Sequence, residues 1–334
     1  METVVSGIRP TGKLHLGNYF GAVKNFLRMQ NDYKCYFFIA DYHSLTTHPT
    51  PSDLHQSVKR VLAEYLALGL DPEKSTLYLQ SDLPETAELY LFLNMNAYKG
   101  ELERVASFKE KIKQHPENVN AGLLTYPVLM AADILLHRGN KVPVGKDQEQ
   151  HLEMARTFGN RFNRLYNAEY FPEPVAFNYN DALVKVPGLT DSGKMSKSAG
   201  EYDNIYMSDD ADILKKKIMK AVTSVVDKPS EPGSAKPSAV QNLFDLMALV
   251  SQKDVIAHFN DTFYAGTIRF GDMKKQLAED MEAFISPYRQ TIEDTLNNDA
   301  LLSKTAKLGA DKARESAGKT IADVRELIGF KRFY

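Results

Sequence analysis

The sequence of 334 residues has no tryptophan and a single cysteine, Cys35, which excludes an internal disulfide framework and a cysteine-based metal centre. The net charge of −2 gives no general basic character, so any binding of nucleic acid must depend on a local surface. No apolar run approaches the ~18 residues of a membrane-spanning helix. The first residues do not show the basic segment followed by an apolar segment that is typical of a secretion signal. These absences predict a cytoplasmic protein with no membrane contact.

The composition is that of an ordinary globular protein, with 43% hydrophobic and 25% charged residues, and the length suggests two domains. Apolar runs at residues 34–40 and 75–80 predict buried strands, separated by a helix over residues 50–69 with a capping threonine and a proline at its start. Strands that alternate with helices predict an α/β fold with a parallel sheet. After about residue 204 only helical patterns follow, which predicts an all-α second domain.

Two glycine-containing stretches have the composition of phosphate-binding loops. Residues 6–18 follow a β-branched run and precede apolar residues at helical spacing, and a strand, a glycine-rich turn and a helix N-terminus together favour an anion. Residues 193–200 contain Lys194 and Lys197, whose compact positive charges suit phosphates. Residues 193–200 alone are more typical of a solvated loop, and a glycine-rich turn alone is weak evidence, so only the combination of the two stretches indicates a common function.

The positions of further polar residues favour one site at one edge of the sheet. Residues 7–12, 41–43 and 145–148 each follow a run that is predicted to be a strand. Ligands of parallel sheets bind beyond the carboxyl ends of the strands. We therefore expect these three segments to lie at the same edge.

The two loops together resemble the signature motifs of the class I aminoacyl-tRNA synthetases. Residues 15–18, His-Leu-Gly-Asn, are similar to the family's H-I-G-H, and residues 194–198 are its K-M-S-K-S without change. Asn in place of the last His is similar to the tryptophanyl branch of bacterial type. Four more stretches resemble that branch in the same order along the chain: residues 100–104, 123–127, 130–135 and 142–148.

This resemblance implies a Rossmann-like catalytic domain over residues 1–204 and a helical domain for the anticodon of tRNA(Trp) over residues 205–334. It implies that the carboxylate of L-tryptophan attacks the α-phosphate of ATP, with release of pyrophosphate and Mg²⁺ bridging the phosphates, before transfer to the 3′ end of the tRNA. The catalytic residues that it implies are His15, Asn18, Lys194 and Lys197. The ATP-binding residues that it implies are these four with Arg9, Pro10, Thr11, Gly17, Gly145, Lys146, Asp147, Val186, Met195, Ser196 and Ser198.

Asp133 is the residue expected to select the amino acid. A carboxylate within the apolar stretch 128–136 is costly unless it has a partner, and the indole N–H is a pure donor that would suit it. A nearby arginine is the alternative partner. The resemblance further implies that Tyr126 and Gln148 bind the amino group of tryptophan. It implies that Met130, Val142, Val144 and His43 surround the indole ring.

Three positions depart from the branch: Arg9 and Tyr42 stand where glutamine is common, and Lys146 stands where an acid is usual. No protein-bound metal is expected, and residues 101–111 resemble the segment through which this family forms homodimers. A tyrosyl-tRNA synthetase has the same fold and signatures and is the nearest alternative. A cofactor nucleotidylyltransferase and a catalytically silent tRNA-binding paralogue are more distant ones.

Overall fold

The structure is a computed structural model that describes residues 1–114, 116–145, 148–179, 185–190, 193–196, 200–223, 230–331 and 333. It contains two compact units. Unit 1 comprises Met1–Gly12, Asn25–Ala182 and Asn298–Tyr334, and unit 2 comprises Lys13–Lys24 and Leu183–Asn297. Relative to a single division at residue 204, residues 13–24 and 183–204 belong to unit 2 and residues 298–334 belong to unit 1. The assignment of catalytic and anticodon-binding domains to residues 1–204 and 205–334 stays a prediction.

Unit 1 is built on a five-stranded sheet, and the expected α/β class with parallel strands is confirmed. Its strands are β1 (Thr3–Ile8), β2 (Lys34–Ile39), β3 (Thr76–Leu79), β4 (Lys141–Val142) and β5 (Val175–Ala176). They lie in the order β3-β2-β1-β4-β5, which is the arrangement of a Rossmann-like half-sheet. Ile8 pairs with Ile39 and Ile39 with Leu79, so these three strands end level at one edge.

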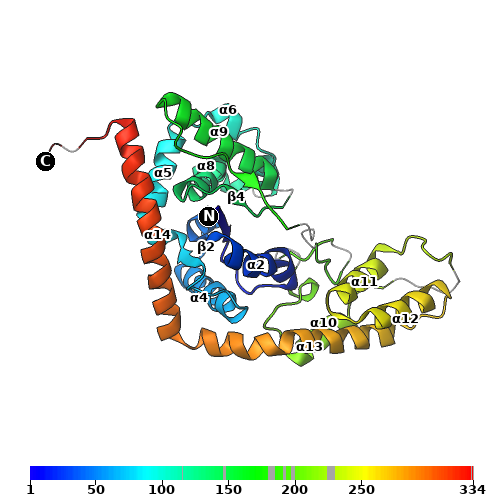
Figure 1. The fold of residues 1–334 in the computed structure, drawn as a ribbon. Coiled ribbons are helices and arrows are strands. Elements are labelled where there is room, and N and C mark those ends of the chain that lie inside the picture. Colours follow the sequence, from blue (N-terminus) through cyan, green and yellow to red (C-terminus); the bar gives the residue numbers. More distant parts are fainter. Residues whose placement is uncertain are drawn as a thin grey trace. The chain divides into compact units, whose positions relative to one another are not determined.

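The helices of unit 1 pack around this sheet (Figure 1). They are α2 (Lys24–Asp32), α3 (Asp41–Ser44), α4 (Pro51–Ala67), α5 (Pro84–Asn94), α6 (Lys99–Leu102), α7 (Ala106–Gln114), α8 (Ala121–Leu136), α9 (Glu149–Leu165) and α14 (Asp299–Ile328). Thr50 caps α4 through its side chain, and proline occupies the first helical position, as the sequence predicts. Between α5 and α8 the chain forms two short helices, α6 and α7, and the short strand β5 is a further element that the sequence does not predict.

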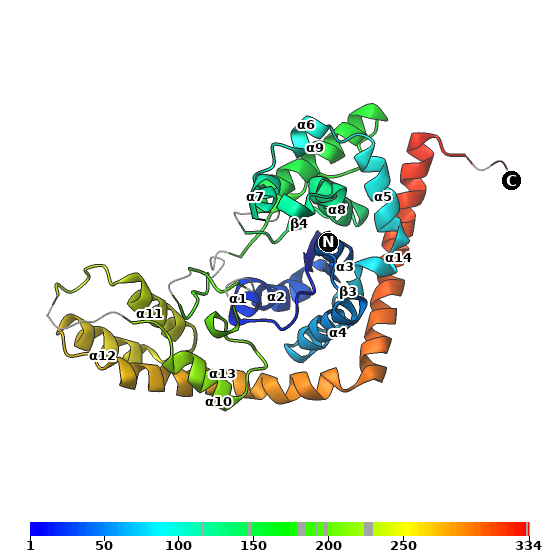
Figure 2. The same cartoon turned by 180° about the vertical axis from the view of Figure 1, so that it is seen from behind.

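The C-terminal helix α14 belongs to unit 1 and lies beside β3, α4 and α5 (Figure 2). A Cβ atom added at Gly309 would lie only 1.5 Å from the carbonyl oxygen of Leu77, so glycine is required for this close approach. Ala313 and Ala317, one and two turns further on, are fully buried. Small residues on this face therefore bring the helix backbone against the sheet.

Unit 2 is helical, with α1 (Leu16–Asn18), a π-helical turn (Tyr19–Val23), α10 (Ala211–Met219), α11 (Ser238–Val250), α12 (Lys253–Tyr264) and α13 (Phe270–Leu296). The expected helices after residue 204 are thus confirmed. The short N-terminal segment joins them through aromatic packing, since the rings of Phe20 and Phe284 stack at 5.4 Å and that of Tyr19 meets Phe284 edge-on at 5.5 Å.

Candidate active site

In unit 1, Asp133 lies on the apolar helix α8 with 2% of its surface exposed. His43, which follows β2, donates a hydrogen bond from Nε2 to Oδ2 over 2.8 Å. Gln80, which follows β3 directly, donates from Nε2 to Oδ1 over 2.7 Å. The alternative partner within the protein, an arginine, is therefore not found among the described residues, and a histidine and a glutamine contact the carboxylate instead. Strand ends bring both side chains to the carboxylate.

Burial raises the pKa of the Asp133 carboxyl above its ordinary value, while the hydrogen bonds and charge of His43 oppose that shift. Each carboxylate oxygen has two lone pairs, so the two protein donors leave acceptor capacity for a third. Two buried atoms of the same group, Nδ1 of His43 and Oε1 of Gln80, have no hydrogen-bond partner among the described residues. The group is therefore a dry polar site with unused hydrogen-bonding capacity.

Tyr126 connects this group to a cavity of about 140 Å³ on unit 1. Its ring centroid is 4.4 Å from that of His43, and Lys111 Nζ lies 4.6 Å from the ring centroid on a cation–π contact. Burial raises the pKa of Tyr126, so its hydroxyl stays protonated. The cavity is lined by Tyr42, Leu45, Thr46, Tyr90, Asn120, Gly122, Thr125, Tyr126 and Leu129.

The other residues expected around tryptophan lie in two neighbouring environments. Met130 and Val144 pack against the apolar cluster that contains the buried Val142. Gln148 accepts a hydrogen bond from Nδ1 of His151 over 2.9 Å, and the ring of His151 is 5.6 Å from that of Tyr126. His151 and Gln80 were not predicted. A signal for Gln80 existed, because it is the last residue of a predicted strand.

At the end of β1, the Arg9 guanidinium donates to Thr47 Oγ1 over 3.4 Å, and Thr11 Oγ1 donates to the carbonyl of Arg9 over 3.5 Å. Pro10 between them is buried. The positive charge of Arg9 also acts on Lys111, whose pKa is lowered first by burial and then by this neighbour. Arg9 and Lys111 therefore contribute positive charge near Tyr126.

In unit 2, the first signature motif forms a reciprocal helix cap. The backbone N–H of Asn18 donates to Nδ1 of His15 over 3.3 Å, and Oδ1 of Asn18 accepts from the backbone N–H of His15 over 3.1 Å. The Leu16 N–H donates to the carbonyl of Ile205 over 2.9 Å. Asparagine at the fourth position thus has a structural reason, because its side chain closes the cap.

The second signature motif begins in a short backbone-bonded stem. Met195 N donates to the carbonyl of Val186 over 2.9 Å, and Gly188 N donates to the carbonyl of Gly193 over 2.8 Å. The side chains of Val186 and Met195 are both buried. A Cβ atom added at Gly17 would lie 3.6 Å from Cβ of Met195, so the two motifs are in contact within unit 2.

Asn204 fastens the described ends of the second motif. Its side-chain amide donates to the carbonyls of Ser196 and Gly200, each over 2.8 Å, and the residue is fully buried. Lys194 and Gly145 lie in the described part of the chain. Four residues expected to bind ATP, Lys146, Asp147, Lys197 and Ser198, lie outside the described residues.

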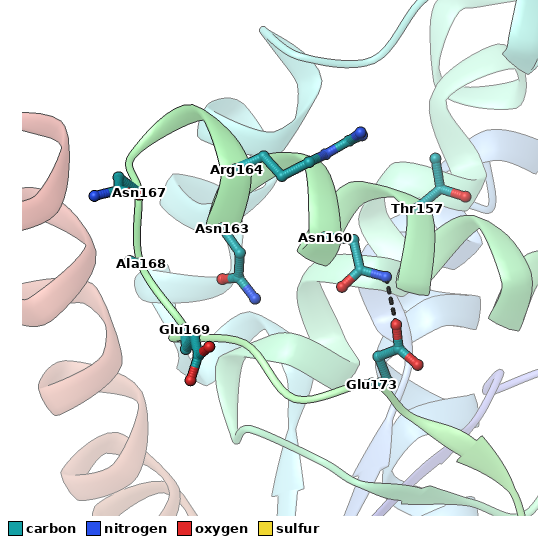
Figure 3. A pocket seen from close by; sticks show the side chains of 8 residues that line it. All are labelled: Thr157, Asn160, Asn163, Arg164, Asn167, Ala168, Glu169 and Glu173. Atoms are coloured by element: carbon teal, nitrogen blue, oxygen red, sulfur yellow. Dashed lines mark hydrogen bonds between the residues drawn. The ribbon is translucent and has the colours of Figure 1, made fainter.

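Another hollow, with a volume of about 860 Å³, lies elsewhere on unit 1 (Figure 3). It lies at the end of α9 and the segment after it, where the Asn160 amide donates to Glu173 over 2.6 Å. None of the residues predicted for the active site lines it, so its size does not indicate the reaction site. Within the described part of the chain, no group of three or more His, Cys, Asp or Glu residues is placed to hold a metal ion. No described helix is long and apolar enough to cross a membrane.

The chain matches, over residues 2–286, the family model of "tRNA synthetases class I (W and Y)". A tryptophan–tRNA ligase of Porphyromonas gingivalis is 58% identical over 331 residues, covering 99% of this chain and 100% of the relative. One from Clostridium tetani is 39% identical over 335 residues, covering 98% and 96%. Among solved structures, the tryptophanyl-tRNA synthetase of Campylobacter jejuni complexed with ADP and tryptophan has a TM-score of 0.86 and 34% identity, covering 98% of this chain and 100% of that one.

Proposed function

Because the chain belongs to the tryptophan–tRNA ligases of the class I aminoacyl-tRNA synthetase family, we propose that Asp133 is the residue through which it selects tryptophan. The enzyme activates L-tryptophan with ATP to the adenylate and pyrophosphate, and then transfers the amino acid to tRNA(Trp). The observation that carries the assignment is the buried carboxylate with two protein donors and acceptor capacity for a third.

The chemistry of Asp133 explains why tryptophan is preferred. An indole N–H that donates to this carboxylate replaces the water that burial has removed. Phenylalanine offers no donor and leaves the carboxylate desolvated, and sites of this kind reject such analogues by ~10⁴-fold or more. His43 and Gln80 fix the carboxylate so that it cannot turn away. We propose that Tyr126 and Gln148 bind the amino group and that Met130, Val142, Val144 and His43 surround the ring.

The signature residues of unit 2 are assigned to the nucleotide. We propose that His15, Gly17 and Asn18 bind the α-phosphate side of ATP and that Lys194 and Lys197, with the two serines of the motif, bind the leaving pyrophosphate. This division is supported by the contact between the two motifs and by their backbone-held stem. Activation by carboxylate attack on phosphate needs positioning and charge stabilisation rather than covalent work by the protein.

The remaining ATP contacts are proposed on the motifs alone. Arg9, Pro10 and Thr11 follow β1, and Gly145, Lys146 and Asp147 follow β4, as segments beyond strand ends do in nucleotide-binding sheets. Val186 and Met195 are proposed to flank the adenine. Mg²⁺ would arrive with ATP and be held by phosphate oxygens and water, as is usual for this ion.

We further propose a cytoplasmic homodimer. Leu91, Met95 and Tyr98, at the end of α5 and just beyond it, are exposed by 47%, 74% and 63%. Contiguous exposed apolar side chains mark association surfaces. They precede the segment 101–111 that resembles the dimer-forming region of the family. Sedimentation of a species of twice the 37.6 kDa chain mass would support the dimer, and a monomer at micromolar concentration would exclude it.

The tyrosyl alternative is supported by fold alone. The tyrosyl-tRNA synthetase of Aeropyrum pernix has a TM-score of 0.64 but only 17% identity, covering 92% of this chain and 89% of that one. The deciding experiment is amino-acid-dependent exchange of pyrophosphate into ATP with tryptophan, tyrosine and phenylalanine. We expect exchange with tryptophan only. Exchange that is faster with tyrosine than with tryptophan would contradict the assignment of Asp133.

A further inference from the structure

Unit 1 has a second hollow, of about 480 Å³, at the opposite edge of the sheet from Gln80. It begins at the amino ends of two strands, at Lys34 of β2 and Thr76 of β3, and α14 forms its other wall. We call it the amino-edge pocket and define it by Lys34, Tyr36, Arg138, Lys312, Lys319 and Thr320. None of these residues is used by the proposed activation reaction.

The cations of the amino-edge pocket outnumber its acids. Lys312 forms an ion pair with Glu73 at 3.6 Å, and Lys319 forms one with Asp323 at 2.9 Å. Lys34 and Arg138 form no ion pair with any described residue, and each lies over a tyrosine ring instead.

Those two rings also line the pocket. Lys34 Nζ is 5.4 Å from the Tyr36 ring centroid, and the Arg138 guanidinium carbon is 5.0 Å from that of Tyr170. Aromatic faces hold cations without neutralising their charge. Two positive charges are thus kept beside one hollow.

The backbone conformation of Arg138 is a further indication that its side chain has a role in binding. Arg138 follows α8 with φ +50°, in the left-handed region where helices commonly end on glycine. Its N–H still bonds the carbonyl of Leu135 over 2.9 Å, as a terminal turn requires. A long side chain here costs backbone energy that glycine would avoid. Outliers of this kind are found at ligand sites.

Hydroxyl groups form the floor of the pocket. Thr76 and Thr320 are exposed by only 8% and 2%, and Tyr36 by 2%; the side chain of Thr320 hydrogen-bonds Tyr170. The ring of Tyr36 stacks on that of His137 at 4.0 Å. Burial and the charge of Lys34 lower the pKa of His137 to about 3, so this ring is neutral and the positive charge belongs to Lys34 and Arg138.

Three features oppose an anion: the carboxylate of Glu315, which also lines the pocket, the negative C-terminal end of α8, and the carboxylate of Asp323, whose pKa the charge of Arg138 helps to lower. A monoanion would gain little against them. A phosphate group carries more charge and several acceptor oxygens, which can take donors from Lys34, Arg138 and the Thr76 hydroxyl together. Cationic and hydroxyl donors in one hollow are typical of phosphate recognition.

We propose that the amino-edge pocket binds a phosphate group, carried either by a small molecule or by the backbone of RNA. This proposal is independent of the role of Asp133, since the pyrophosphate exchange that tests that role requires none of the pocket residues. The pocket volume lies in the range of small-molecule sites, and the exposed heads of Lys34 and Arg138 leave it open to a strand as well.

The first test measures binding of labelled inorganic phosphate by equilibrium dialysis. The protein is kept saturated with tryptophan and a non-hydrolysable ATP analogue, which occupies the reaction site. We expect one further phosphate per chain for the wild type and at least tenfold weaker binding for the Lys34→Gln, Arg138→Gln double variant. Arg138→Lys keeps the charge and should keep most of the binding.

The matched control is Lys304→Gln, because Lys304 is an exposed lysine of α14 that lies outside the pocket. This variant should bind phosphate like the wild type. Circular dichroism melts of all variants verify that loss of binding is not loss of fold.

The second test distinguishes the source of the phosphate. Binding of tRNA(Trp) is measured between 50 and 300 mM salt, where each lost phosphate contact lowers the slope of log affinity against log salt by about one. A slope reduced by about two in the double variant assigns the pocket to the RNA backbone, whereas an unchanged slope with lost phosphate binding assigns it to a small molecule. The proposal is wrong if the double variant equals Lys304→Gln in both measurements.

Discussion

Asp133 in unit 1 and the second signature motif in unit 2 are held in place by different kinds of contact. The Asp133 carboxylate is fixed by two side chains from distant parts of the sequence, His43 and Gln80, in a site closed to water. The described residues of the second motif are held at their backbone, by the bonds of Met195 with Val186 and of Gly188 with Gly193 and by the side chain of Asn204. A buried side-chain group can distinguish two amino acids, because any unmatched polar atom is costly there. A backbone-held stem only has to present cationic side chains to a phosphate, which every ATP supplies.

This difference predicts that the largest effect on substrate choice arises from the carboxylate. Asp133→Ala should lower the preference for tryptophan over phenylalanine, measured as the ratio of kcat/KM in pyrophosphate exchange, by ~10⁴-fold. Glu279→Ala removes an exposed carboxylate from α13 and should leave the ratio unchanged. A ratio preserved in Asp133→Ala would show that the carboxylate takes no part in selection.

Unit 2 also contains a buried charged pair, which should affect stability rather than specificity. Lys217 Nζ lies 2.7 Å from Asp209 Oδ2, and the two side chains are exposed by 1% and 2%. Lys217→Met leaves Asp209 buried without its partner and should lower the free energy of unfolding by ~3–5 kcal/mol in urea titrations. The exposed neighbour Lys216 is the control, and Lys216→Met should change it by less than ~0.5 kcal/mol. Equal unfolding midpoints of the two variants would contradict this prediction.

The signature lysine should affect rate and leave tryptophan affinity unchanged. Lys197→Ala should slow adenylate formation by ~100-fold or more, since one transition-state donor contributes ~3–4 kcal/mol. Tryptophan affinity should stay at the wild-type value, because the pyrophosphate contact matters only after the amino acid is bound. Lys215→Ala, on the exposed face of α10, should have neither effect. A wild-type rate of single-turnover activation would remove Lys197 from the mechanism.

The smallest expected effect is a pH dependence of stability in unit 1. Burial lowers the pKa of His137 to about 3 in the folded chain, so between that value and ~6.5 only the unfolded chain takes up the proton. The contribution of His137 to the free energy of unfolding is therefore fully present above pH ~6.5. It falls by ~2 kcal/mol on going to pH 5, at ~1.4 kcal/mol per pH unit.

Denaturant unfolding at pH 7 and pH 5 measures this loss. His137→Gln should reduce it, whereas the exposed His55→Gln should retain it. The same loss in all three proteins would show that His137 is not its source.

The sequence predicts those strands and helices that are marked by a long apolar run or by capping residues close by in the sequence. The strands at 34–40 and 75–80 and the helix after Thr50 follow from apolar runs and capping residues, and they are confirmed. The edge strand β5 has only two residues, both exposed, so no hydrophobic pattern marks it. The packing of α14 on β3 depends on the absence of a side chain at Gly309, and a helix pattern does not show which surface it covers.

The sequence predicts that the buried Asp133 carboxylate needs hydrogen-bond donors, but it does not predict which residues provide them. A carboxylate within an apolar helix requires donors, and this requirement marked Asp133. The identity of those donors depends on which strand ends meet α8, which brings His43 and Gln80 together across 90 and 53 residues of sequence. The asparagine at position 18 departed from the family pattern, and only the reciprocal cap with His15 gives it a physical reason.

The most direct test is a fluorescence titration with tryptophan. The chain itself contains no tryptophan, so the added ligand is the only indole in the sample. Its emission should shift to the blue on binding to the wild type, and Asp133→Ala should need ~10- to 100-fold more tryptophan for the same shift, because a hydrogen bond to a charged group contributes ~1.5–3 kcal/mol. Equal midpoints for the two proteins, or displacement of tryptophan by tyrosine at equal concentration, would contradict selection by Asp133.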